Sequence, residues 1–342
     1  MTPASWPRPE PREDRLLRID PGAATWRDAR LGDLPEELLP GDLLVVNDAA
    51  TLPASLRGRG PAGEEVEVRL AGLGEDGGWW AVLFGAGDWR TRTEDRPPPP
   101  RLFPGDRIAF GPDLRAEVRR VDGGSSRLIA VAFDRAGAPL WSALYRHGRP
   151  VQYAHLRAPL ALWHVQTGYA ARPWAMELPS AGRPLTARAL RDLARRGVGL
   201  ATVTHAAGLS STGEAALDAR LPLPERFEVP PRAVQAIEEA RARGGRVVAV
   251  GTSTVRALEG QAALHDGRLA AGGGVTGLAI GPAHRLRVVD GLLTGLHEPG
   301  SSHFELLKAF APEVLLLDAL AHAEAEGYLA HEFGDSSLVL RG

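Results

Sequence analysis

The residues of this chain that could do chemistry gather in a few polar stretches, and the first of them opens a helix. A predicted buried strand, residues 246–251, is followed by Thr252, Ser253, Thr254 and Arg256. Free backbone N–H groups at a helix N-terminus, together with hydroxyl side chains, suit an anionic or carboxylate ligand. Ordinary capping of the helix by Ser or Thr explains the same pattern. The stretch is not a Walker loop, because no Gly-Lys-Ser/Thr follows the glycine.

A second polar turn, residues 179–186, also precedes a predicted helix. Thr186 is a suitable N-cap for that helix, and Gly197 is a stop signal. Arg183 within the turn could meet a carboxylate or a phosphate. An exposed arginine on a surface turn is an equally good interpretation, so the turn alone leaves both open.

A third group of stretches is rich in histidine and acid. His297, Glu298 and His303 lie close together in the sequence, and the segment 331–335 adds another His-Glu pair and Asp335. Two His-Glu pairs suggest a metal, but the zinc helix motif needs histidines four residues apart on one helix, and Pro-Gly interrupts any helix here. We therefore expect proton transfer or hydrogen bonding and no metal. Structural hydrogen bonds of partly buried histidines are the alternative, for these residues and for His205.

The composition is that of an ordinary globular protein. A chain of 342 residues exceeds the size of one typical core, so two domains are expected. A net charge of −2 excludes a uniformly basic nucleic-acid-binding surface, so any RNA contact must come from a local patch. The absence of cysteine excludes disulfides, thiolate metal sites and a cysteine nucleophile. With no signal peptide and no long apolar run, we expect a cytoplasmic protein; a monomer is expected.

Two patterns divide the chain. Residues 59–150 contain short strand candidates separated by turn residues, which predict a small antiparallel β-barrel. Residues 1–58 and 151–342 alternate strands with helices, which predicts an α/β domain with a mostly parallel sheet and helices on both faces. The barrel is therefore expected as an insertion. Residues 1–15, rich in proline and charge, are expected to form an arm.

Several stretches, in the order in which they occur along the chain, resemble motifs of the S-adenosylmethionine:tRNA ribosyltransferase-isomerase family of queuosine biosynthesis. The similarity extends over roughly residues 16–342. The matching segments are residues 45–48, 53–54, 166–170, 179–182 with Thr186, 251–259, 288–294 with His297 and Pro299, and 334–335.

The resemblance implies an α/β domain with an inserted barrel and a specific reaction. Family members move the ribosyl part of S-adenosylmethionine onto 7-aminomethyl-7-deazaguanine at the tRNA wobble position, giving epoxyqueuosine and releasing adenine and methionine. The sulfonium acidifies the neighbouring C5′ hydrogens, so a general base can remove one. S-adenosylmethionine is then a substrate, tRNA is a partner, and the reaction implies no further cofactor and no metal.

The resemblance also implies roles for individual residues. Residues 252–254 with Arg256 would hold the methionine or ribose end. His297 is the best candidate base, polarised by Glu298 or Asp335. Asn47 and Asp48, which end a predicted buried strand at the edge of the sheet where ligands bind, would line the pocket. The other residues expected to bind substrate are Ser180, Gly182, Arg183, Thr186, His205, Thr294 and His303.

The chain departs from the family pattern in segments expected to line the pocket. Arg-Pro-Leu at 183–185 stands where the family has Leu-His-Phe, and residues 220–225 lack two family histidines. Two other functions therefore stay open: transfer to, or cleavage with, a small non-tRNA acceptor, and a non-catalytic RNA- or nucleotide-binding role. Each of these possible functions requires residues 180–186, 252–256 and 297–303 to face one cleft.

Overall fold

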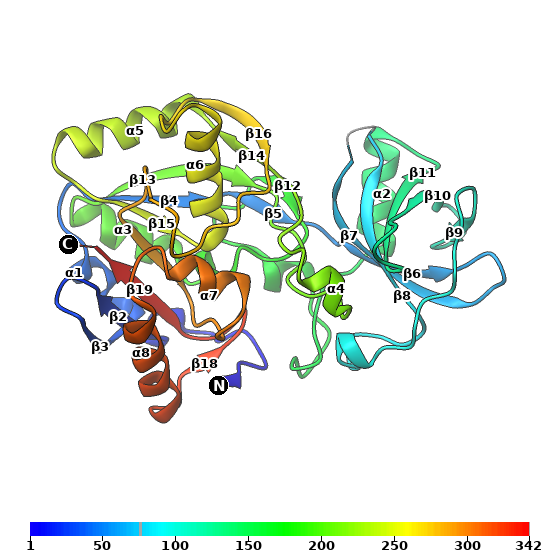
Figure 1. Cartoon of the computed structure of the whole chain (residues 1–342), viewed down its shortest axis with the longest axis horizontal. Helices are drawn as coiled ribbons and strands as arrows, with labels where there is room; N and C mark the ends of the chain where they lie inside the picture. The colour runs from blue at the N-terminus through cyan, green and yellow to red at the C-terminus, as the bar shows by residue number, and fades with distance from the viewer. Residues whose placement is uncertain (75–76, 342) are drawn as a thin grey trace.

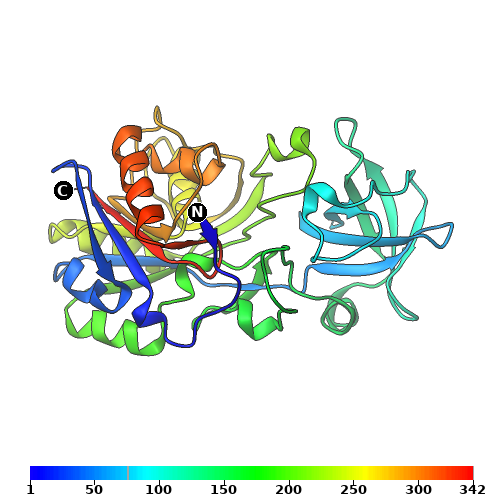
Figure 2. The same cartoon turned by 90° about the horizontal axis from the view of Figure 1, so that it is seen from below.

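The computed structural model describes residues 1–74 and 77–341. Figures 1 and 2 show two bodies side by side, a large α/β body and a smaller barrel. Within the described residues, no helix is both long enough and apolar enough to span a bilayer.

The large body is built on a nine-stranded sheet in the order β16-β14-β13-β4-β15-β17-β19-β2-β3. Its centre, from β13 to β17, is parallel, and antiparallel pairs extend it on both sides. The strands are β2 (Arg15–Asp20), β3 (Thr25–Arg30), β4 (Leu43–Asn47), β13 (Gly199–His205), β14 (Glu225–Val229), β15 (Val247–Val250), β16 (Gly272–Thr276), β17 (Gly291–Gly295) and β19 (Ser336–Leu340).

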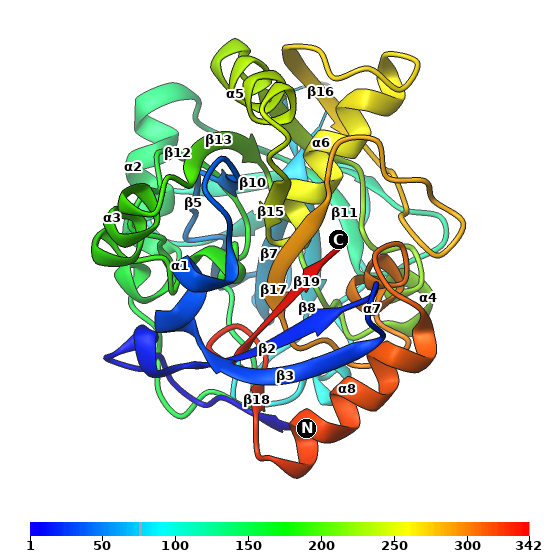
Figure 3. The ribbon, with the colours of Figure 1, turned by 90° about the vertical axis from the view of Figure 1, so that its left-hand side faces the viewer.

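Helices cover both faces of this sheet, as Figure 3 shows. In β4, Leu43 and Val45 belong to one buried cluster, whereas Leu44 and Val46 belong to another. Strands that are buried on both faces are continuous apolar runs, which is how β4 and β15 appear in the sequence. The helices are α1 (Leu34–Glu37), α3 (Ala187–Arg195), α5 (Pro231–Ala242), α6 (Thr252–Leu264), α7 (Ser302–Leu307) and α8 (Glu313–Ala325), with the single-turn α4 (Ala215–Asp218) near the barrel.

The barrel closes through six strands in the order β10-β11-β8-β7-β6-β9, all paired antiparallel. The predicted fold class, a parallel-centred α/β sheet with an antiparallel barrel, is therefore confirmed. The barrel strands are β6 (Ser55–Arg59), β7 (Glu65–Leu73), β8 (Trp79–Phe84), β9 (Arg107–Ala109), β10 (Arg115–Val121) and β11 (Leu128–Phe133), followed by α2 (Gly137–His147).

The chain crosses between the two bodies twice, and the crossings lie side by side. On the way out, β5 (Ala49–Thr51) pairs with β12 (Arg172–Ala175), which belongs to the returning segment. Ser55 and Arg149 exchange backbone hydrogen bonds of 2.9 and 2.8 Å where the barrel begins and ends. We propose that residues 59–150 are an inserted domain; β6 spans the boundary proposed between residues 58 and 59.

The N-terminal segment is packed on the α/β body, whereas a free arm was expected. Strand β1 (Thr2–Pro3) pairs with β18 (Leu329–Ala330), and Ala4 is buried. The Arg8 guanidinium donates to Asp14 at 2.9 Å and to Asp335 at 2.6 Å. Ion pairing with two buried carboxylates and strand pairing near the C-terminus hold the segment in place.

One buried carboxylate organises the barrel. Glu67 accepts hydrogen bonds from Ser55 Oγ at 2.8 Å, Arg69 Nε at 2.7 Å and Arg96 Nη1 at 2.7 Å. Although burial opposes its ionisation, the two guanidinium groups lower the pKa of Glu67 from 4.5 to about 2. Arg69 also lies over the ring of Tyr153, 5.4 Å from its centroid.

We expect Glu67→Gln to destabilise the protein by about 3 kcal/mol, because it leaves two buried guanidinium groups without their counter-charge. Since the folded-state pKa of Glu67 is lowered, this contribution is complete above pH 4.5 and is lost as the pH falls towards 2. Urea unfolding at pH 7 and pH 3 measures both effects. Glu117→Gln removes the exposed barrel pair with Arg119 and should change little; equal losses for the two variants would contradict the prediction.

Candidate active site

A cavity of about 440 Å³ lies at the C-terminal edge of the parallel strands. Three distant stretches of chain line it, so the cleft that the sequence requires does exist. They are the start of α6 with Thr252, Ser253 and Arg256, the 3-10 helix η5 (Ser180–Gly182) with Ser180 and Ala181, and the segment after β17 with Thr294, His297, Ser302 and His303.

The Asn47 side chain holds the floor of this cavity together. Its Oδ1 accepts the N–H groups of Ala49 at 3.0 Å and His205 at 2.9 Å. Its Nδ2 donates to the carbonyl of His205 at 2.9 Å and to Ser253 Oγ at 3.3 Å. Two accepted and two donated bonds use the full capacity of an amide. Asn47 therefore fixes the end of β13 and the start of α6 relative to β4.

Asn47 and Asp48 were expected to line the pocket, but the structure places both behind its floor. Asn47 is 2% exposed and Asp48 is 7% exposed, and neither is among the residues that line the cavity. Asp48 Oδ1 accepts a 2.5 Å hydrogen bond from Thr204 Oγ1. Their role is to support the site, because their polar groups are already bonded within the protein.

Helix α6 begins with N–H groups that face the cavity. Gly251 has φ +88°, a conformation that residues with a Cβ rarely adopt, and it turns the chain sharply from β15 into the helix. No side chain of the described residues caps this first turn. Thr254 Oγ1 donates to the carbonyl of Val250 at 2.8 Å and is fully buried, so only Thr252 and Ser253 of the three hydroxyl residues face the cavity.

Arg256 brings unused hydrogen-bond donors to the cavity wall. An ion pair of 2.5 Å joins its Nη1 to Glu225 Oε2, while its buried Nε and Nη2 have no hydrogen-bond partner among the described residues. Burial lowers the pKa of Arg256, and the adjacent carboxylate of Glu225 opposes that effect. A buried guanidinium with two unused donors suits a carboxylate ligand.

His205 lies beside this ion pair and does not line the cavity. Its Nε2 is 3.3 Å from Glu225 Oε2, and the residue is fully buried. Burial, with a smaller contribution from Arg256, lowers the pKa of His205 to about 3. The imidazole is therefore neutral at neutral pH, and contact with the substrate, as expected from the sequence, is not available to it in this arrangement.

His297 is a neutral imidazole at the cavity wall. Its Nε2 is 2.8 Å from Thr294 Oγ1, and its ring stacks on that of His303 with centroids 4.9 Å apart. Burial lowers the pKa of His297 well below 6.5 and that of His303 to about 4. A neutral imidazole can accept a proton, so the arrangement is compatible with general base catalysis.

The partner of His297 differs from the one expected. Glu298 is exposed at the rim of a neighbouring cavity. The carboxylate of Asp335 accepts hydrogen bonds from Arg8 at 2.6 Å, the Arg15 N–H at 2.8 Å and the Leu329 N–H at 2.7 Å. Asp335 is thus engaged by the N-terminal segment and by the Leu329 N–H, and Thr294 orients the His297 ring.

The other expected residues of the 179–186 turn lie outside the main cavity. A Cβ on Gly182 would come within 2.0 Å of Tyr169 Oη, so close packing requires glycine there. Thr186 Oγ1 accepts the Ala189 N–H at 3.3 Å and caps α3, as predicted. Arg183 donates to the carbonyl of Arg8 at 3.2 Å and lies over the ring of Phe333, 5.2 Å from its centroid.

The sequence patterns miss a partly buried polar network that also lines the cavity. Tyr153 Oη donates to the carboxylate of Glu177, which also accepts the Ser210 N–H at 3.2 Å. Burial raises the pKa of Glu177, and all three residues line the cavity. They are single polar residues in three separate loops, so no local motif marks them. Glu225, also missed, does have a signal, because it ends the segment 220–225 that was compared with the family pattern.

A second cavity of about 600 Å³ lies between the barrel and the α/β body. Arg92 and Glu94 line it from the barrel side. It shares several lining residues with the first cavity, namely Tyr153, Ser210, Leu296, His297, His303 and His331. His297 therefore borders both spaces.

Comparisons with known proteins agree over the whole chain. The family described as queuosine biosynthesis protein matches residues 2–339. The S-adenosylmethionine:tRNA ribosyltransferase-isomerase of Anaeromyxobacter dehalogenans (strain 2CP-C) is 39% identical, covering 97% of this chain and 94% of the relative. Its namesake from Synechococcus sp. (strain RCC307) is also 39% identical, with 96% and 90% covered. The crystal structure of S-adenosylmethionine tRNA ribosyltransferase from Thermotoga maritima has a TM-score of 0.53 at 25% identity, covering 99% of this chain and 96% of that one.

We expect Asn47→Asp to destabilise the protein by about 3 kcal/mol or more, because it replaces two donated hydrogen bonds with a buried charge facing the His205 carbonyl. Thermal and urea unfolding measure the loss. Gln235→Glu is the matched amide-to-acid change on the exposed face of α5 and should leave stability nearly unchanged. An unchanged melting temperature for Asn47→Asp would show that this amide does not hold the floor.

Proposed function

The chain belongs to the S-adenosylmethionine:tRNA ribosyltransferase-isomerase family of queuosine biosynthesis, and on that premise we propose that its 440 Å³ cavity binds S-adenosylmethionine for ribosyl transfer to tRNA. One observation carries the proposal. An uncapped helix N-terminus, a guanidinium with unused donors and a neutral histidine all line the same cavity. Transfer to a small acceptor gains no support, since the tRNA-modifying relatives match the chain over nearly its full length.

The methionine carboxylate is assigned to the start of α6. Backbone N–H groups at a helix N-terminus attract anions, and Arg256 adds two donors that are free to form charge-assisted hydrogen bonds. Four carboxylates line the same cavity, from Glu177, Glu225, Glu305 and Glu332. Negative charge around the cavity favours the positively charged sulfonium and ammonium groups of the substrate.

His297 is assigned as the general base that removes the C5′ proton. Its lone pair is available at neutral pH because burial keeps the ring neutral. Thr294 sets the orientation of the ring, and stacking on His303 restrains it further. Because His297 borders both cavities, the second cavity is the proposed entrance for the acceptor base of the tRNA, with the ribosyl group passing between the two spaces.

We expect His297→Gln to lower kcat by roughly 10²- to 10⁴-fold with a small change in KM, because the variant keeps a polar side chain but cannot act as the base. Chromatography of released adenine, in the presence of tRNA carrying the deazaguanine, measures the rate. The variant His265→Gln, at the exposed end of α6, is the control. Since the pKa of His297 is lowered, the wild-type rate should stay level as the pH falls from 8 to 6.5. A steep fall within that range, or a kcat close to wild type, would remove His297 from the role.

Arg256→Gln should raise KM for S-adenosylmethionine by roughly 10- to 100-fold, the effect of losing one or two charge-assisted hydrogen bonds. The single variant also leaves Glu225 without its partner, so it should lose stability. The double variant Arg256→Gln with Glu225→Gln removes both charges; it should recover stability but not binding. Recovery of binding together with stability would mean that Arg256 acts only by supporting the fold.

A further inference from the structure

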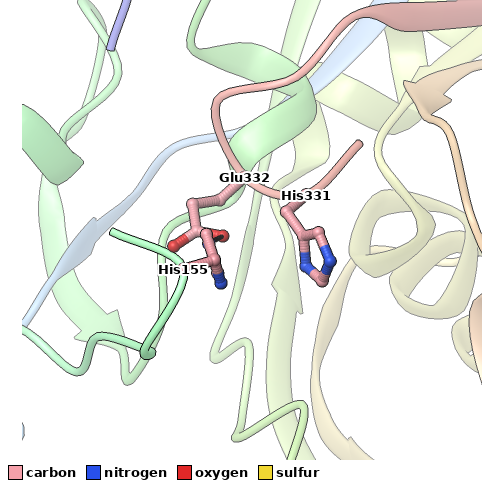
Figure 4. A group of neighbouring side chains, drawn as sticks. All are labelled: His155, His331 and Glu332. Carbon is pink, nitrogen blue, oxygen red and sulfur yellow. Dashed lines mark hydrogen bonds and ion pairs between the residues drawn. The ribbon is translucent and has the colours of Figure 1, made fainter. Parts of the chain in front are cut away.

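A compact group of metal-ligating side chains lies at the border of the two cavities. Figure 4 shows His155, His331 and Glu332, whose ligand atoms all lie within 4.8 Å of one another. His155 Nε2 is 3.0 Å from Glu332 Oε2, and the two imidazole rings stack with centroids 4.5 Å apart. His155 and His331 line the second cavity, and His331 and Glu332 line the first.

The group is assembled by tertiary structure. His155 comes from the segment that returns from the barrel, whereas His331 and Glu332 lie between β18 and β19; His155 and Glu332 are 177 residues apart. No spacing motif can therefore reveal the group. The two His-Glu pairs weighed in the sequence, at residues 297–298 and 331–332, did not include His155.

Both parts of the group are anchored by buried neighbours. Leu156 and Phe333, each adjacent in sequence to one of the ligands, belong to the same hydrophobic cluster and are 3% and 1% exposed. His331 has φ +67°, a backbone conformation that is uncommon and unfavourable for residues other than glycine. The Gly334 N–H donates to the His331 carbonyl at 2.9 Å and stabilises this turn. The loop thus keeps an unfavourable conformation in which His331 stacks on His155.

The ligand types select among cations. Two imidazole nitrogens and one carboxylate match zinc and similar transition metals, whereas magnesium and calcium prefer sets of oxygen ligands. A tetrahedral zinc ion with bonds of roughly 2 Å separates its ligand atoms by roughly 3.3 Å. The pair His155 and Glu332 is already near that spacing at 3.0 Å, and the His331 ligand atom lies within 4.8 Å of both.

We propose that His155, His331 and Glu332 bind one divalent transition-metal ion, zinc by preference, with its remaining coordination position open towards the cavities. The ion would tie the segment returning from the barrel to the C-terminal loop of the α/β body. The adjoining cavity is lined by Glu298 and by Arg92 and Glu94, which form an ion pair with each other, so one carboxylate there is not offset by the arginine. The proposal does not depend on the assigned catalytic roles, because it concerns ion binding alone.

Titration of the metal-free full-length chain with zinc chloride, followed by calorimetry, tests the proposal. One ion should bind per chain, and cobalt(II) should give the visible absorption of a low-symmetry N/O site. His155→Gln, His331→Gln and Glu332→Gln should each weaken zinc binding at least about tenfold, since even the loss of groups that only support metal ligands has an effect of that size. His265→Gln is the matched exposed control and should bind zinc like the wild type.

Two results would overturn the proposal. One is the absence of zinc binding at micromolar concentrations by a wild-type chain whose circular dichroism shows it folded; the group would then be a metal-free ion pair with a stacked histidine. The other is zinc binding that survives all three ligand substitutions but is lost in His297→Gln or His303→Gln, which would assign the ion to that stacked pair. A zinc-dependent rise in melting temperature that disappears in His331→Gln would support the site independently.

Discussion

The side-chain amide of Asn47 is the constraint on which the geometry of the site depends. It lies where β4 ends, and its four hydrogen bonds reach the chain after β4, the end of β13 and the start of α6. Of these, only the start of α6 lines the cavity itself, and the other two lie behind that lining. A buried amide whose donors and acceptors are all satisfied has one favourable orientation, so the elements it joins have one favourable arrangement. The positions of Ser253 and Arg256 follow from that arrangement.

Burial then sets the protonation states that the site offers. The histidines around the cavity are neutral because the surrounding protein partly desolvates them, and the one guanidinium that lines the cavity among the described residues keeps its charge because Glu225 is beside it. The result is a proton acceptor and an anion-binding group in one enclosure. A chain with almost no net charge can therefore present a strongly polarised interior.

How well each part of the site could be predicted depends on how far apart in the sequence its contacting residues are. Helix α3 with its Thr186 cap, and α6 after Gly251, are set by neighbouring residues, so their positions could be predicted closely. Asn47 was recognised as important, but its role as a support depends on contacts more than 150 residues away. Tyr153, Glu177 and Ser210 meet only in the folded chain, and the pairing of the N-terminal segment with β18 has no local signal. Local patterns thus identify elements, and tertiary packing decides which side chains meet.

The paired crossings between the two bodies have an evolutionary consequence. The backbones of Ser55 and Arg149 are hydrogen-bonded to each other. The chain therefore enters the barrel and returns to the α/β body at one place. None of the nine strands of the sheet lies between Ser55 and Arg149. Insertions, losses or exchanges of sequence in that interval therefore leave the order of the nine strands unchanged. Val151, Met176, Leu209 and Leu217 nevertheless pack in the same cluster as the barrel side chains, so changes within the barrel are constrained where they meet these residues.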